Sequence, residues 1–196
     1  MTFVTHRVTK VIRNGRIAAS GWSDWGLMVR EARKRDAVAV ARLLHDFNLE
    51  YDEPSPGVEW VAARLEGLLE AGEVVVLVAE GAGPAVGEGG SGEGGGGRTD
   101  DPVGLALLRF RLGLWSEGAE AHLQELYVVP ARRGQGFGRA LLEAAMAAAR
   151  AAGAATLDLN TTPEDRAAIG LYESAGFTNR EGAPDGPPML FYERDL

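Results

Sequence analysis

A basic, glycine-rich turn in the last third of the 196-residue chain holds the residues whose types and spacing most clearly suggest chemistry. It contains three alternating glycines and three arginines: Gly134, Gly136, Gly138, Arg132, Arg133 and Arg139. Because glycine has no Cβ atom, backbone N–H groups in such a turn can approach a ligand closely. A helix is expected to begin near Phe137, so these N–H groups also lie at the positive end of a helix dipole. The turn therefore predicts an anion site, and a pyrophosphate is the anion we expect; the alternative is a purely structural turn.

An extended strand is expected to lead into this turn. The strand is expected over residues 119–129, because the β-branched and aromatic run that ends at Val129 favours an extended chain, and Pro130 ends the strand because it has no N–H group to donate. Strict alternation places the Glu125 side chain on the same side as Leu123 and Tyr127, unless a β-bulge intervenes. A carboxylate on that otherwise apolar face would have a raised pKa suited to proton transfer. The alternative is an exposed glutamate without a catalytic role.

Two well-known phosphate-binding patterns do not fit the turn. A dinucleotide-binding turn requires Gly-x-Gly-x-x-Gly, but the sixth position counted from Gly134 is Arg139. Counted from Gly136, the sixth position is Leu141. Asp158 does lie about twenty residues further on, as that pattern expects, so a nicotinamide-dependent oxidoreductase is kept as a minority alternative. The Walker pattern is excluded because no Gly-Lys-Ser/Thr follows the glycines.

The apolar patterns elsewhere predict a mixed order of strands and helices. Strands are expected at residues 27–32, 73–80, 103–112, 119–129, 156–160, from Phe177 onward and at 189–193, and helices at 36–47, 61–72, 137–153 and from a Thr162 cap to Ala175. The first helix is expected to end before Asn48. Glu50 would then lie in an acidic loop, which is either a solvated turn or a lip that attracts a cationic substrate. This order predicts an α/β (α+β) fold in which helices cover both faces of a mixed sheet.

The length suits one domain with appendages. Residues 1–26 are expected to be a tail, with an extra strand or an arm that joins a homodimer as the alternative, and residues 27–196 are expected to be the domain. Residues 81–100 are glycine at half of their positions and interrupt a predicted hairpin. Lengthening a four-residue turn to about twenty residues costs only on the order of 1.4 kcal/mol, so this insertion requires no functional explanation.

Composition narrows the class of protein. The hydrophobic share of 45% and the charged share of 24% are ordinary for a globular protein, and no apolar run is long enough to span a membrane. The absence of cysteine excludes disulfides and thiolate nucleophiles, and three scattered histidines predict no metal site. The first residues lack the apolar segment of a signal peptide, so we expect a cytoplasmic protein. A net charge of −8 argues against nucleic acid as a partner and is compatible with a cationic acceptor.

The turn resembles the acetyl-CoA signature of the GCN5-related N-acetyltransferase (GNAT) family. Arg133-x-x-Gly136-x-Gly138 follows a strand that ends in Val-x-Pro, as in that signature. A second motif of the family, Asn-x-x-Ala-x-x-x-Tyr followed by Gly-Phe, is matched by Ala168, Tyr172, Gly176 and Phe177, whereas Asp165 replaces the asparagine. The two motifs cover roughly the last third of the chain in the family's order.

This resemblance implies the family's fold and reaction. The fold would be that of acyl-CoA N-acyltransferases. The enzyme would move the acetyl group of acetyl-CoA to a primary amine, on a small molecule or a peptide, by direct attack and without a metal. The implied cofactor-binding residues are Tyr127, Val128, Val129, Arg133, Gly134, Gln135, Gly136, Phe137, Gly138, Arg139 and Asp165. The alternatives are a non-catalytic acyl-CoA-binding regulatory module and the oxidoreductase mentioned above.

The resemblance also implies catalytic roles. Tyr172 would protonate the departing thiolate, because a phenol with a pKa near 10 can donate to a thiolate with a pKa near 8.5; the alternative is a half-buried tyrosine that packs beside Phe177. The amine must lose a proton first, which at neutral pH costs on the order of 4.6 kcal/mol for a pKa of about 10.4. Glu125 is the expected base, directly or through water, and His122 is a second candidate. Asp165 only accepts hydrogen bonds and would repel phosphate, so we expect it to cap its helix.

Overall fold

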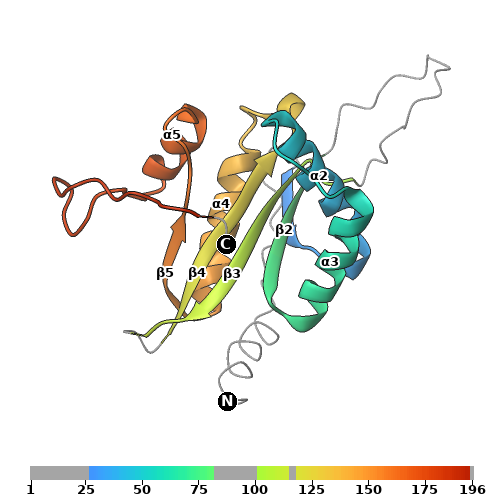
Figure 1. Cartoon of the computed structure of the whole chain (residues 1–196), viewed down its shortest axis with the longest axis horizontal. Helices are drawn as coiled ribbons and strands as arrows, with labels where there is room; N and C mark the ends of the chain where they lie inside the picture. Colours follow the sequence, from blue (N-terminus) through green and yellow to red (C-terminus); the bar gives the residue numbers. More distant parts are fainter. Residues whose placement is uncertain (1–26, 82–100, 115–117, 195–196) are drawn as a thin grey trace. The chain divides into compact units, whose positions relative to one another are not determined.

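The computed structural model describes residues 27–81, 101–114 and 118–194 (Figure 1). The described residues fall into two compact units, which divide between Asp158 and Leu159. The expected N-terminal tail and the glycine-rich insertion, apart from its first residue, Gly81, lie outside the described residues. None of the described helices is long and apolar enough to pass through a membrane.

The sheet contains five strands that neighbour one another in chain order: β1 (Leu27–Glu31), β2 (Val74–Gly81), β3 (Gly104–Leu112), β4 (Ala119–Val128) and β5 (Ala154–Leu159). The first four strands are antiparallel, which confirms the predicted hairpin of β2 and β3. Helix α4 (Phe137–Ala151) connects β4 to β5, and a connection of this length lets β5 run parallel beside β4 (Figure 1). The sheet is therefore mixed, as the sequence pattern predicted.

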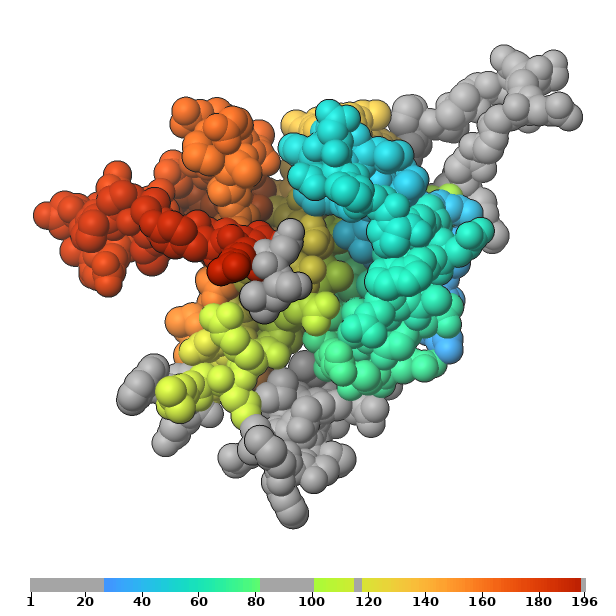
Figure 2. All heavy atoms as spheres, viewed as in Figure 1, coloured from blue at the N-terminus to red at the C-terminus, as the bar shows by residue number. Residues whose placement is uncertain are grey.

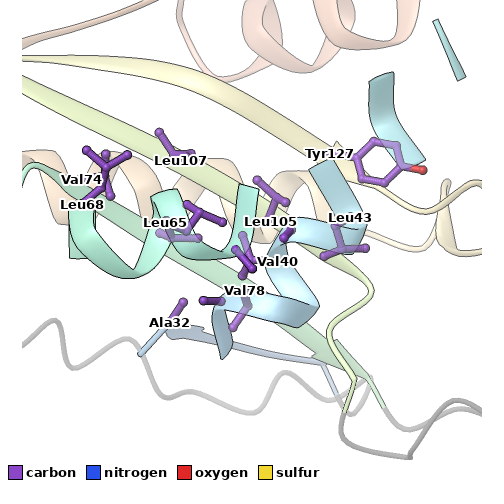
Figure 3. Packing of buried hydrophobic residues seen from close by; sticks show 14 residues of the cluster. Ala32, Val40, Leu43, Leu65, Leu68, Val74, Val78, Leu105, Leu107 and Tyr127 are labelled. Carbon is purple, nitrogen blue, oxygen red and sulfur yellow. The ribbon is translucent and has the colours of Figure 1, made fainter. Parts of the chain in front are cut away.

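Helices cover both faces of this sheet, and α2 (Ala37–Glu50) and α3 (Val58–Ala71) share one face. Their buried side chains form one core cluster with alternate strand residues, part of which is labelled in Figure 3: Val40, Leu43, Leu65, Leu68, Val74, Val78, Leu105, Leu107 and Tyr127. On the other face, α4 packs through Leu141, Leu142 and several buried alanines, whose small size allows a close approach. Each fully buried leucine contributes roughly 1.5–3 kcal/mol, so the sheet forms a firm platform for the loops at its ends.

Helix α2 is longer than the sequence pattern predicted. It continues past Asn48 to Glu50, so the prediction that it ends before Asn48 is wrong, and Glu50 lies on the helix rather than in a loop. The ring centroid of Phe47 lies 5.4 Å from that of Tyr127 on β4. This contact and the hydrogen bond from the Tyr51 N–H to the Asn48 carbonyl stabilise a last turn that local polarity did not favour.

The second unit contains helix α5 (Arg166–Ser174) and no strand between α5 and residue 194. The two late strands, predicted from Phe177 onward and at residues 189–193, are therefore wrong for the described chain. Only an isolated bridge forms there, between Arg180 and Pro188. The apolar side chains of the second expected strand are exposed. Residues with strand propensity form a strand only where a neighbouring strand pairs with them.

Candidate active site

The predicted turn connects β4 to α4 through backbone that glycine favours. Pro130 begins a short 3₁₀ helix, η2 (Pro130–Arg132), which stops β4 as expected. Gly134 and Gly136 follow with φ angles of 74° and 88°, and α4 begins at Phe137. A Cβ atom at either glycine would meet no other atom within 4 Å, so one side of the turn is open. The glycines are therefore required by the backbone conformation and also leave space beside it.

The backbone N–H groups of this turn are arranged as an anion site requires. The backbone N–H groups of Arg132 and Arg133 donate to the carbonyls of Val129 and Pro130, respectively. The next backbone hydrogen bond along the chain runs from the Ala140 N–H to the Gly136 carbonyl. Within the part of the chain that the structure describes, no acceptor takes the N–H groups of Gly134, Gly136 or Gly138, and no side chain caps α4. Helix α4 has 15 residues, so its dipole adds positive potential at these donors.

The Arg133 side chain is held by the protein itself. Its Nη1 and Nη2 atoms donate to the two carboxylate oxygens of Glu50 at 2.6 and 2.7 Å, and its Nε atom donates to the Val128 carbonyl at 2.9 Å. Figure 2 shows the end of α2 against the loop that precedes α4. The carboxylate neutralises the guanidinium, so this residue adds less positive charge to the turn than its type suggested.

The other two basic side chains of the turn are Arg132 and Arg139. The Arg132 guanidinium lies 5.9 Å from the centre of the Phe137 ring, and its Nη1 atom is 3.5 Å from the Gln135 side-chain oxygen. Gln135 in turn donates to the Ala131 carbonyl at 3.0 Å. Arg139 is exposed in the first turn of α4. Positive charge at the turn therefore comes from Arg132, Arg139 and the helix dipole.

The Phe137 ring and the end of β4 fix the position of the turn. Phe137 is buried and packs over Gly81, where a Cβ atom would come within 2.6 Å of the ring. At the end of β4, the Val129 N–H donates to the Val103 carbonyl at 3.0 Å, and Val128 is buried. These contacts hold both ends of the glycine turn.

A β-bulge decides which way Glu125 faces. Leu107 of β3 pairs with Glu125, but the neighbouring Leu108 pairs with Leu123, so Gln124 is an extra residue on β4. Glu125 consequently shares the face of Tyr127, and the expectation that it also shares the face of Leu123 is wrong because the bulge reverses the alternation. No sequence signal marked its location.

The surroundings of Glu125 suit a group that exchanges protons. Burial raises the pKa of the Glu125 carboxyl, and the hydrogen bond from Gln124 and the nearby charge of His122 offset part of this rise. The Gln124 Nε2 atom lies 3.4 Å from the Glu125 carboxylate. A half-buried carboxyl with a raised pKa can accept a proton closer to neutral pH than an ordinary glutamate can.

His122 belongs to a polar network that spans three strands. Its Nδ1 atom makes a hydrogen bond with Asp158 of β5, and Asp158 also accepts from Arg111 Nη2 at 3.0 Å. Arg111 Nε donates to Glu120 at 2.7 Å. Asp158, whose position kept the dinucleotide alternative open, is therefore engaged by an imidazole and a guanidinium. Among the described residues, no three histidine or acidic side chains gather as a metal site would require.

Asp165 and Tyr172 lie in the second unit. The Asp165 carboxylate accepts a hydrogen bond from the Ala168 N–H at 2.9 Å and caps α5. The predicted capping role of Asp165 is confirmed, whereas the predicted Thr162 cap is wrong, because α5 begins at Arg166. Tyr172 is buried with its ring 6.0 Å from that of Phe177, as its structural alternative expected.

Comparison with known proteins decides the family. Residues 91–177 match the family model of the Acetyltransferase (GNAT) family. The chain is 31% identical over 154 residues to the N-acetyltransferase YhfO of Bacillus subtilis, an alignment that covers 79% of this chain and 91% of YhfO. The chain belongs to the GNAT family. Thialysine N-epsilon-acetyltransferase from Bos taurus is 29% identical over 168 residues, which cover 80% of this chain and 88% of the bovine protein.

A solved structure supports the same conclusion. The crystal structure of an acetyltransferase from Arthrobacter sp. FB24 is 44% identical to this chain and superposes with a TM-score of 0.70, over 86% of this chain and 96% of that one. This GNAT chain is therefore an acetyl-transferring enzyme, and members of the family take the acetyl group from acetyl-CoA. Neither a nicotinamide oxidoreductase nor a non-catalytic module is supported by these relatives.

Proposed function

We propose that this enzyme transfers the acetyl group of acetyl-CoA to a primary amine by direct attack. The observation that carries the proposal is the open start of α4, where the N–H groups of Gly134, Gly136 and Gly138 have no acceptor in the described chain. These donors suit the two phosphates of the coenzyme A pyrophosphate. The chain has no cysteine, which agrees with a route that needs no acyl-cysteine.

Around this start we propose a cofactor site built from the end of β4, the turn and the first residues of α4: Tyr127, Val128, Val129, Arg133, Gly134, Gln135, Gly136, Phe137, Gly138 and Arg139. Arg132 and Arg139 would add charge toward the phosphates, and the strand end would line the chain that carries the thioester. Asp165 would contribute little to the binding of an anion, because its carboxylate is negative and already caps α5. The bound thioester supplies the acyl group.

Glu125 is the proposed proton acceptor. Its raised pKa, caused by burial, keeps the carboxyl nearer to the pH at which proton exchange with an amine is efficient. His122 is the second candidate, because its imidazole is oriented by Asp158 through Nδ1. Separate Glu125→Gln and His122→Asn variants distinguish them, since only loss of the true acceptor removes the acid limb of the pH profile.

Tyr172 is the proposed acid that returns a proton to the leaving thiolate. The proposal rests on its place in the second family motif and on the chemistry of a phenol, which holds its proton at neutral pH. Burial of this side chain keeps bulk water from its ring. A phenylalanine at this position would preserve the packing against Phe177 while removing the proton, so it makes a clean test.

The proposed acceptor is an amine on a flexible aliphatic chain. The name of the bovine relative places the acetyl group on an ε-nitrogen, and a net charge of −8 favours the approach of a cationic substrate. The panel for testing should contain thialysine, lysine, a polyamine and an aminoglycoside. Lysine acetylated on both nitrogens and a tertiary amine are the negative controls, because neither has a primary amine.

The test is the release of free coenzyme A thiol from acetyl-CoA with each amine, followed by mass spectrometry of the product. We expect thiol release that depends on a primary amine, together with one added acetyl group on that amine. Thiol release that no primary amine stimulates, or acetylation of a hydroxyl instead, would overturn the proposed substrate class.

A further inference from the structure

The contact between Glu50 and Arg133 joins two parts of the sequence that are 83 residues apart. Two hydrogen bonds of 2.6 and 2.7 Å join the side chains. Both side chains are partly shielded from solvent, with 28% of the Glu50 side chain and 43% of the Arg133 side chain exposed. A fork-to-fork pair of this kind fixes direction as well as distance. The third bond, from Arg133 Nε to the Val128 carbonyl, ties the same guanidinium to the end of β4. The arginine thus bridges helix α2 and the strand that precedes the turn.

The location of Glu50 would be unfavourable without this arginine. It is the last residue of α2, where the helix dipole is negative, and the last turn of α2 contains no basic residue. Arg133 supplies the missing cation. In agreement, the hydrogen bond with Arg133 lowers the pKa of the Glu50 carboxyl, and the same contact raises the pKa of Arg133.

Tyr127 is the third member of this group. Its ring lies in the core cluster with its hydroxyl directed away from the aliphatic residues (Figure 3), and this hydroxyl makes a small contribution to the lowered pKa of the Glu50 carboxyl. The Arg133 guanidinium lies 5.6 Å from the centre of the same ring. The guanidinium that Glu50 holds therefore also lies against an aromatic ring of β4.

We propose that Glu50 is a positioning residue of the cofactor turn, acting through Arg133 to hold the N–H groups of Gly134 and Gly136 in place for the pyrophosphate. This inference rests on the proposed function of the turn. Three N–H groups of Arg133 are used by Glu50 and Val128, so its main role is to orient the turn, and the phosphates are bound by the backbone and by Arg132 and Arg139.

This role predicts the opposite sign from a direct role of Arg133. If Arg133 bound the phosphates itself, removal of the competing Glu50 carboxylate would release the guanidinium and would tighten acetyl-CoA binding. If Glu50 positions the turn, its removal weakens binding. The sign of one dissociation constant therefore separates the two accounts.

The experiment measures the dissociation constant of acetyl-CoA by calorimetry for wild type, Glu50→Gln, Glu50→Asp, Arg133→Gln and the Glu50→Gln/Arg133→Gln double variant. We expect Glu50→Gln to raise the constant about three- to tenfold, and Glu50→Asp to restore part of the loss. The double variant should bind no more weakly than the weaker single variant, because both changes break one contact. Glu70→Gln, which removes a surface ion pair with Lys34, is the matched control and should bind as wild type does.

A second readout excludes a general loss of structure. With S-acetylpantetheine, an acetyl donor that lacks the pyrophosphate, kcat/KM should be the same for wild type and Glu50→Gln, whereas with acetyl-CoA the KM rises and kcat changes little. Tighter acetyl-CoA binding by Glu50→Gln, or equal losses with both donors, would overturn the positioning role. If wild type itself does not bind acetyl-CoA, the proposed function fails, and that result is distinct from a wrong sign in the variants.

Discussion

The two helix starts that the sequence pattern associated with the cofactor differ in one residue type. At α4 the N-cap is Gly136, which has no side chain and leaves the N–H groups of the first turn without an acceptor in the described chain. At α5 the N-cap is Asp165, whose carboxylate accepts from the Ala168 N–H at 2.9 Å. One start is open and positive, and the other is closed by its own negative charge.

This difference shows that the N-cap residue decides whether a helix start is stabilised by its own side chain or leaves its N–H groups for an anion. Compared with an aspartate cap, a glycine cap gives up roughly a few tenths of a kcal/mol of helix stability and leaves the donors of the first turn without a side-chain acceptor, and the buried residues of α4 can sustain that loss. Helix α5 has 9 residues and only Tyr172 is buried, so it depends more on its cap. We therefore propose that the anion site belongs to α4 alone, and from α5 we expect the phenol of Tyr172 and no phosphate contact.

The largest effect should come from the phenol. Tyr172→Phe removes the proposed acid but keeps the ring beside Phe177, so kcat should fall by about 10²- to 10⁴-fold with little change in melting temperature. Steady-state kinetics and thermal unfolding of the same preparation provide the measurement. Unchanged turnover would show that α5 contributes packing only.

Removal of the Glu125 carboxyl should have the second-largest effect on activity. Glu125→Gln should lower kcat/KM about 10²-fold near neutral pH. Protonation of this carboxyl removes the base, so kcat/KM should fall at acidic pH. Because burial raises the pKa of the carboxyl, this fall should occur above pH 4.5, the ordinary glutamate value. The glutamine variant should lose this acid limb.

The same substitution has a consequence for stability. The folded state holds the Glu125 proton more tightly than the unfolded chain does, so the charged carboxylate costs stability above its raised pKa, and the cost disappears as the pH falls through it. The Glu125→Gln variant should therefore be at least as stable as wild type at neutral pH.

An acid limb of kcat/KM that persists in Glu125→Gln would instead assign the base to His122.

Converting the open helix start into a closed one should have a smaller effect. Gly136→Asp gives α4 the kind of cap that α5 has, and aspartate tolerates the left-handed backbone of this position better than most residues. The new carboxylate should raise the dissociation constant of acetyl-CoA about tenfold relative to Gly136→Asn, which has the same shape without the charge. Equal affinity of the two variants would mean that the cofactor phosphates do not approach this start.

The smallest effect is expected at the closed start. Asp165→Ala should lower the free energy of unfolding by about 1 kcal/mol, because the Ala168 N–H loses its acceptor, and Asp165→Asn should retain most of the cap. Urea unfolding measures both. Neither variant should change acetyl-CoA affinity more than about twofold; a tenfold gain for Asp165→Asn would place this helix start in the anion site.

Sequence reasoning reached most of the fold because its elements are locally marked. Pro130 ends β4, Gly72 ends α3 in a left-handed conformation, and apolar spacing marks the buried sides of the helices. The late strands could not be predicted reliably. The apolar run at residues 189–193 has strand propensity, but a strand also requires a neighbour, which local sequence does not specify.

The candidate site was predicted where it depends on residue type and missed where it depends on tertiary contacts. The glycines predicted the open turn, and Asp165 predicted its own cap. The bulge at Gln124, which sets the face of Glu125, leaves no trace in the alternation of side chains. The pairing of Glu50 with Arg133 bridges 83 residues; an acidic residue at the end of a helix without basic neighbours is a signal only once the helix boundary is known.

The most direct test of the central claim is a ¹H–¹⁵N NMR titration that follows the amides of Gly134, Gly136 and Gly138 as coenzyme A is added. The account predicts that these three resonances shift to saturation together with binding, and that S-acetylpantetheine, which lacks the pyrophosphate, leaves them in place. Saturation with coenzyme A while these amides remain unshifted would contradict it.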